Sequence, residues 1–171
     1  MFDREKAVAY LEASRQQLHD AVAGLSEAQW RFQPAAERWS VADCVEHIAV
    51  VEELILAEVE KALREPPRPH GDSSKDAIVL RAVPNRSRRV TAPEHVRPSR
   101  RWPDPAAAFD ERRARSLAFA RTTQADLRAH FYPHFILGDL DAYQWLLFLS
   151  AHAERHIAQL NEVKADPGFP A

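Results

Sequence analysis

Apolar residues recur every three or four positions in four stretches of the chain, a period typical of amphipathic α-helices. These stretches lie at residues 3–24, 40–63, 104–129 and 141–164. The last stretch has the clearest pattern. The third has the weakest apolar stripe, and its arginines indicate that much of its surface faces water. The hydrophobic pattern therefore predicts four helices.

Two of the predicted helices have recognisable N-terminal caps. Ser40 followed by Asp43 is close to a capping box, and Trp39 directly before it can pack on the first helical turn. Asp141 followed by Gln144 repeats this arrangement at the start of the last helix. We therefore expect these two helices to begin directly after residues 40 and 141.

The segment between the second and third helices is long and rich in proline. Residues 65–103 hold seven of the 12 prolines and show no helical period, although the run AIVLRAV at residues 77–83 also fits a short strand. So long a connection is no hairpin turn and allows the third helix to run parallel to the second. We expect an all-α fold in a single domain covering residues 1–171, a four-helix bundle with a long crossover between helices two and three.

Composition and charge exclude several classes of protein. A net charge of -2 and a pI near 6.4 give no overall attraction for nucleic acid or acidic lipid. Cys44 is the only cysteine, which excludes an intramolecular disulfide and fits a reducing compartment. No segment approaches the ~20 apolar residues of a membrane span, and the first residues do not resemble a signal peptide. We expect a cytoplasmic protein with no membrane or nucleic-acid partner.

Three histidines lie at positions where the surrounding pattern predicts the core. His152 and His156 are four residues apart on the last helix, and therefore project from one face. His47 lies on the apolar face of the second helix. A buried imidazole without a partner costs about 1–3 kcal/mol, so three that converge need a common explanation. A divalent metal ion held by three protein ligands, with one position open, provides it.

These histidines also admit interpretations other than a metal site. A single core histidine is more often satisfied by a local hydrogen bond, and pairs four residues apart also arise by chance. The chain has no Glu-x-x-His spacing of the di-iron bundles, and Ala153 stands where the zincin motif requires glutamate. The glycines form neither a phosphate loop nor a dinucleotide fingerprint.

Two segments together resemble the DinB-like (YfiT-like) metal-binding four-helix bundles. They are WSVADCVEHIAVVEE at residues 39–53 and LDAYQWLLFLSAHAERHIAQL at residues 140–160. The resemblance implies zinc, nickel or iron held by three histidines, which here are His47, His152 and His156. The segment HFYPHFILGDL, which contains His130 and His134, departs from the family's usual entry into the last helix.

The resemblance also implies a class of reaction. Characterised relatives include transferases and isomerases that use a low-molecular-weight thiol such as bacillithiol or mycothiol, and others are described as metal-dependent hydrolases. We expect a thiol S-transferase acting on small electrophiles, with a metal-dependent hydrolase or a non-catalytic metal-stabilised binding protein as alternatives. A homodimer is a further expectation from the resemblance. The catalytic residues are not identified by the sequence.

Several other features admit a functional and a simpler interpretation. Residues 64–101 carry ten Arg or Lys against four Asp or Glu, which could bind an anion, but a solvated loop is the simpler interpretation. Cys44 could add a fourth metal ligand, although a packed core residue is expected more often. Glu46 is expected in solvent and Glu52 near the rim of the site.

Overall fold

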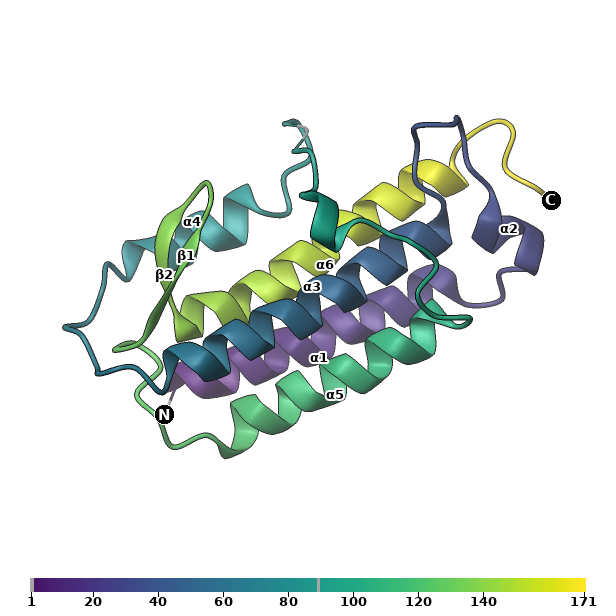
Figure 1. Ribbon diagram of the computed structural model, residues 1–171. Helices are drawn as coiled ribbons and strands as arrows, with labels where there is room; N and C mark the ends of the chain where they lie inside the picture. Colours follow the sequence, from purple (N-terminus) through teal and green to yellow (C-terminus); the bar gives the residue numbers. More distant parts are fainter. Residues whose placement is uncertain (1, 89) are drawn as a thin grey trace.

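The computed structural model describes residues 2–88 and 90–171, and four long helices dominate it (Figure 1). The elements, in chain order, are α1 (Phe2–Val22), α2 (Glu27–Arg31), α3 (Val41–Ala62), α4 (Ser74–Ala82), the short 3-10 helix η1 (Glu94–Val96), α5 (Pro105–Thr122), β1 (Phe131–His134), β2 (Gly138–Asp141) and α6 (Ala142–Lys164).

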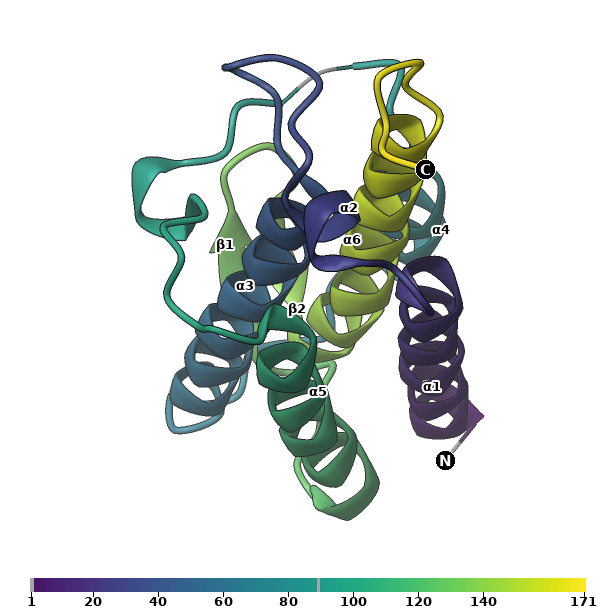
Figure 2. The same ribbon diagram turned by 90° about the vertical axis from the view of Figure 1, so that its right-hand side faces the viewer.

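The four long helices surround a common core, as the second view makes clear (Figure 2). In Figure 1, α3 and α5 run in one direction and α1 and α6 in the other. The segment that joins α3 to α5 contains α4 and η1 and passes over α3 and α6. The prediction of an all-α four-helix bundle is confirmed. Among the helices of the described residues, none is both long and apolar enough to cross a membrane.

The two predicted capping boxes are present and fix where α3 and α6 begin. The Ser40 hydroxyl accepts from the Asp43 amide at 3.1 Å, and the Asp43 carboxylate accepts from the Ser40 amide at 2.9 Å. Asp141 and Gln144 exchange the equivalent hydrogen bonds at 2.7 and 3.1 Å. Because each helix has a defined first residue, the direction in which its histidines point is also defined.

Residues 77–83, which also fit a short strand, form no strand, because all but the last of them lie in α4. A short continuous apolar run has no period that separates a strand from a helix. As a helix, it buries Val79 completely and leaves Ile78 and Leu80 46% and 42% exposed. One apolar side chain, rather than a whole face, packs on the bundle.

The third predicted helix is shorter than expected, since α5 ends at Thr122 rather than near residue 129. The chain then forms an antiparallel hairpin of β1 and β2 that the sequence analysis did not predict. Gly138 begins the return strand with a φ of +69°, a conformation that favours glycine. The indole of Trp145 donates to the carbonyl of Tyr132 at 2.9 Å and attaches the hairpin to α6.

A buried ion pair connects the four long helices. The expectation that the arginines of the third helix face water is wrong for Arg113 of α5, which is fully buried and donates twice to Glu52 of α3, at 2.7 and 2.8 Å. Its guanidinium also donates to the Leu11 carbonyl and the Ser14 hydroxyl of α1, and makes a longer contact of 3.5 Å with the Leu149 carbonyl of α6. Glu52 therefore lies in the core and not at the rim.

We expect Arg113→Ala to lower the free energy of unfolding by about 3–5 kcal/mol, because it leaves the Glu52 carboxylate buried and unpaired. Urea unfolding followed by circular dichroism measures this loss. Replacing both partners, with Arg113→Met and Glu52→Leu, removes both buried charges and should recover most of the stability. A loss below about 1 kcal/mol in Arg113→Ala would contradict the central role of this pair.

Candidate metal centre

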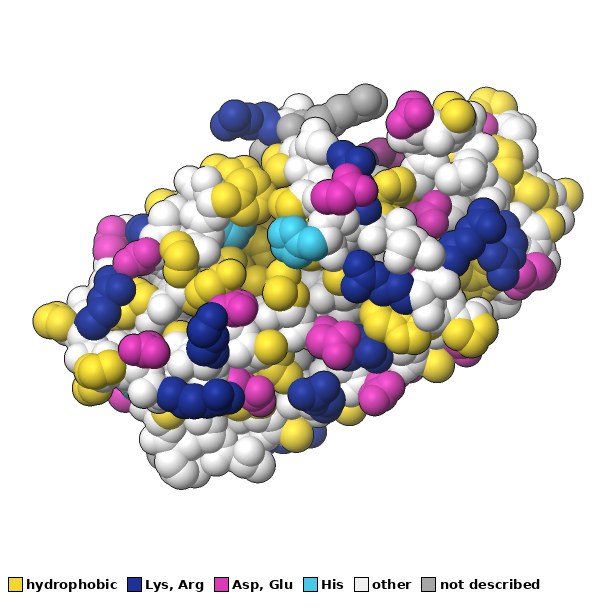
Figure 3. Space-filling view, in the orientation of Figure 1, with side chains coloured by type: hydrophobic (Ala, Val, Ile, Leu, Met, Phe, Trp, Pro, Cys, Tyr) yellow, Lys and Arg dark blue, Asp and Glu magenta, His cyan; other side chains and the backbone are white. Residues whose placement is uncertain are grey.

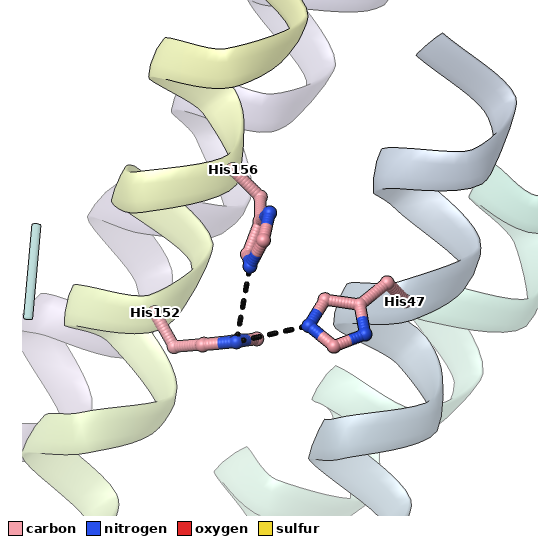
Figure 4. A group of neighbouring side chains, drawn as sticks. All are labelled: His47, His152 and His156. Carbon is pink, nitrogen blue, oxygen red and sulfur yellow. Dashed lines mark hydrogen bonds between the residues drawn. The ribbon is translucent and has the colours of Figure 1, made fainter. Parts of the chain in front are cut away.

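The structure brings His47 of α3 together with His152 and His156 of α6 (Figure 4). The Nε2 atom of His152 lies 3.2 Å from Nε2 of His47 and 3.1 Å from Nε2 of His156. One ring nitrogen from each residue lies within 4.8 Å of the others. The helix spacing accounts for the pair on α6, and the bundle packing places the third ring opposite them.

Two of the three rings are oriented by hydrogen bonds on their far side. His47 Nδ1 donates to the carbonyl of Val96 in η1 at 2.8 Å, and His156 Nδ1 donates to Oε1 of Gln159 at 3.0 Å. Arg86 also donates to this Gln159 oxygen, at 3.1 Å, which fixes the orientation of the amide. In both imidazoles the proton is therefore on Nδ1, and Nε2 presents a lone pair to the centre of the group.

This arrangement leaves the three nitrogens with too few protons. The Nε2 proton of His152 can satisfy only one of the two lone pairs offered by His47 and His156, so the other faces a nitrogen without a donor. A metal ion accepts the lone pairs of His47 and His156 and, with the His152 proton on Nδ1 instead, the lone pair of His152 as well. Metal–nitrogen bonds of ~2.0–2.1 Å in a tetrahedral arrangement separate the ligand nitrogens by roughly 3.3 Å, close to the distances found. The donor set thus fits a divalent ion.

Burial keeps all three imidazoles neutral, as metal ligands must be. It lowers the pKa of His47 to about 4. Burial also lowers the pKa values of His152 and His156 well below the usual range, and the neighbouring imidazoles add to the effect. At neutral pH the group therefore presents three uncharged imidazoles.

Aromatic side chains form the walls of the site. Trp39, directly before the cap of α3, packs on the rings of His47 and His156 with centroid distances of 4.8 and 5.8 Å. Phe148 stacks on His152 from the other side, with centroids 5.4 Å apart. These rings limit access of water to the ligands and strengthen electrostatic interactions within the site.

A fourth histidine, His134, lies at the end of β1 behind Phe148, with ring centroids 5.2 Å apart. Its Nδ1 accepts from the backbone amides of Ile136 and Leu137 at 3.0 and 3.1 Å, so the proton of the neutral ring is on Nε2. Burial lowers its pKa to about 4. It is close enough to His152 to influence that ring electrostatically, but it is not one of the three grouped ligands.

The other residues weighed from the sequence lie away from the imidazole nitrogens. Cys44 is completely buried, burial raises its thiol pKa, and among the described residues only the three histidines group at ligand distance. Glu46 is not in solvent as expected, because only 3% of it is exposed and its carboxylate accepts from the amides of Ser99 and Arg101. His130 donates to the carbonyl of the last residue of α3.

The surface above this part of the bundle combines apolar and histidine side chains. Figure 3 shows a hollow lined by hydrophobic side chains over the middle of α3 and α6, with histidine side chains beside it. Basic and acidic side chains alternate over the same face. Several basic residues of the crossover form ion pairs, such as Arg68 with Asp139 and Arg86 with Glu162.

Comparison with known proteins identifies one similar structure and one similar sequence. YfiT from Bacillus subtilis, described as a probable metal-dependent hydrolase with an unusual four-helix bundle topology, superimposes with a TM-score of 0.65 over 98% of this chain and 89% of its own, at 19% identity. The uncharacterized protein YuaE from Bacillus subtilis (strain 168) is 24% identical over 145 residues, which cover 82% of this chain and 86% of YuaE. The sequence profile of the DinB superfamily matches residues 10–160. This match covers most of the chain, so the protein belongs to the DinB superfamily.

Proposed function

We propose that this protein is a divalent-metal-dependent hydrolase of a small molecule, with His47, His152 and His156 as the metal ligands. The observation that carries the proposal is the convergence of three Nε2 atoms, of which two are held as lone-pair donors by Val96 and Gln159. The description of the structurally similar YfiT as a probable metal-dependent hydrolase supports the same reaction class. Three imidazoles and an open position suit zinc, nickel or iron.

A site with three protein ligands favours catalysis over a purely structural role. Structural zinc sites normally have four protein ligands, and the described residues group only three histidines at ligand distance. The alternative of a non-catalytic, metal-stabilised protein would need a further ligand such as Cys44, whose buried thiol is protonated at neutral pH. A divalent ion in such a site supplies Lewis acidity and activates water or a thiol as nucleophile.

The chain's own side chains have distinct roles in this proposal. Trp39 and Phe148 limit the water around the ligands and give a bound substrate apolar surfaces to pack on. His134 holds a proton at Nε2, from which it can donate a hydrogen bond to a polar substrate or leaving group. No sequence pattern assigns this hydrogen-bond donor to the site, because the hairpin that places it was not expected.

Thiol transfer is the second candidate, because the same open position suits a soft thiolate. Cys44 is buried and protonated, so the thiol has to be an external molecule of low molecular weight. In this reaction the protein needs no general base of its own, and His134 contributes less.

We expect the purified protein to bind about one divalent ion per chain, and His47→Ala, His152→Ala and His156→Ala each to weaken binding by more than about 100-fold. Elemental analysis and competition with a chromophoric zinc chelator measure stoichiometry and affinity. His70→Ala is a matched control, because His70 lies on the exposed crossover and pairs with Asp126. Stoichiometric metal in all three alanine variants would refute the proposed site.

We expect His134→Asn to keep the metal but to slow hydrolysis by about 10²-fold or more, because the Asn oxygen can replace Nδ1 as acceptor while the Nε2 proton is lost. The metal-loaded parent and variant are assayed on a panel of esters and amides, with and without a low-molecular-weight thiol. Turnover that needs the thiol and is unchanged in His134→Asn would establish thiol transfer instead.

The depressed pKa of His134 also predicts how stability depends on pH. Between its folded pKa of about 4 and the ordinary histidine pKa of 6.5, the unfolded chain binds a proton that the folded chain does not, so acid destabilises the fold. Protonation of His134 in the unfolded chain should lower the free energy of unfolding by about 2 kcal/mol at pH 5 relative to pH 7. Urea unfolding of metal-free protein at both pH values should show a smaller loss in His134→Asn; an equal loss would contradict the depressed pKa.

A further inference from the structure

The part of the crossover that orients His47 is attached to α3 by the residue next to it. His47 Nδ1 donates to the Val96 carbonyl at 2.8 Å. The two oxygens of Glu46 accept from the amide of Ser99 at 2.7 Å and from the amide of Arg101 at 3.2 Å. Consecutive residues of one helix thus hold two points of the same short segment, residues 96–101.

The conformation of this segment depends on the Glu46 carboxylate. Arg100, between the two amides, has a φ of +59°, which is strained for a residue with a side chain. Its side chain is exposed, so burial of that side chain does not stabilise the strained conformation. A left-handed residue can turn the amides on either side toward one anion, and the buried carboxylate of Glu46 is that anion.

The orientation of the His47 ring depends on a partner that is distant in the sequence, whereas that of the His156 ring does not. The partner of His156 is Gln159, three residues along the same helix, so helical geometry alone brings them together. The partner of His47 is Val96, which is 49 residues away and lies on a short 3-10 helix between irregular segments. This carbonyl is kept opposite Nδ1 by contacts that attach the crossover to the bundle, namely the buried Val96 side chain and the bonds of residues 99–101 to Glu46.

We infer that Glu46 is a positioning residue of the metal centre, which fixes residues 99–101 on α3 so that the Val96 carbonyl keeps the His47 proton on Nδ1 and leaves Nε2 free to bind metal. The inference rests on the proposed metal site. Glu46 itself contacts no ligand atom of the site; it acts through the loop and the backbone carbonyl.

The first test is Glu46→Gln, which keeps the size of the side chain but replaces one accepting oxygen with an NH₂ group. We expect zinc affinity to fall about 10–100-fold, as for other groups that orient a metal-bound histidine. Nitrogen-15 NMR of the imidazole rings in metal-free protein should show a smaller fraction of His47 with its proton on Nδ1. Glu53→Gln is the matched control, because Glu53 lies on the same helix and pairs with Arg112 at the surface.

The second test changes the loop and leaves Glu46 intact. Arg100→Val should reproduce the loss in Glu46→Gln, because a β-branched residue is strongly disfavoured at a positive φ. Arg100→Gly should retain parental affinity, because glycine adopts this conformation without strain. The double variant Glu46→Gln/Arg100→Val should be little weaker than either single variant, since both disrupt one attachment.

Parental zinc affinity and an unchanged His47 tautomer in a folded Glu46→Gln protein would overturn the inference. If Glu46→Gln does not fold, the comparison of Arg100→Val with Arg100→Gly gives the same decision. Failure of the proposed function is distinguishable, because a parent that binds no metal refutes the metal site while the tautomer of His47 in metal-free protein still reports on the attachment.

Discussion

The guanidinium of Arg113 is the one polar group that meets all four long helices inside the core of the described residues. It contacts all four long helices from inside the core, most strongly Glu52 of α3 and more weakly the Leu149 carbonyl of α6. Glu52 is five residues beyond His47, and Leu149 is three residues before His152, so the ion pair lies beside the level of the histidines. A buried pair of this kind adds little net stability compared with apolar packing, but strongly disfavours any arrangement that separates its partners. The pair therefore fixes α3 against α1 and α5 beside the level of the three converging imidazoles, with a weaker contact to α6.

Much of the fold and the grouped histidines could be predicted from the sequence, because both depend on local regularities. The capping residues at Ser40 and Asp141 define where two helices begin, and the helical period then determines which residues face inward. His152 and His156 share a face for the same reason, and His47 lies within an apolar stripe. Whether the three rings bind metal is a separate matter, and remains a proposal that the family and the geometry support.

The remaining features depend on contacts between distant segments, which leave no period or spacing in the sequence. Arg113 is one of several arginines on a weakly patterned helix, and nothing in its neighbours marks it as the buried one. The role of Glu46 could not be predicted either, because its partners are backbone amides of the crossover, and every residue type except proline has such an amide. The helical conformation of α4 could not be separated from a strand, since its apolar residues are consecutive. The hairpin that positions His134 follows a helix whose end has no glycine or proline to mark it.

The three grouped imidazoles have an energetic cost in the absence of a cation, and hydrogen bonds to two of the rings maintain the arrangement despite that cost. Three buried imidazoles with depressed pKa values destabilise the folded chain in acid, and at least one lone pair faces another nitrogen when no cation is present. Rotation of the His47 or His156 ring would remove the unfavourable contact between facing nitrogen atoms. The Val96 carbonyl and Gln159 prevent such rotation and keep the nitrogens directed at one another. The fold thus maintains an arrangement that is unfavourable by itself, and the proposed metal ion would relieve it, as in a preorganised metal site.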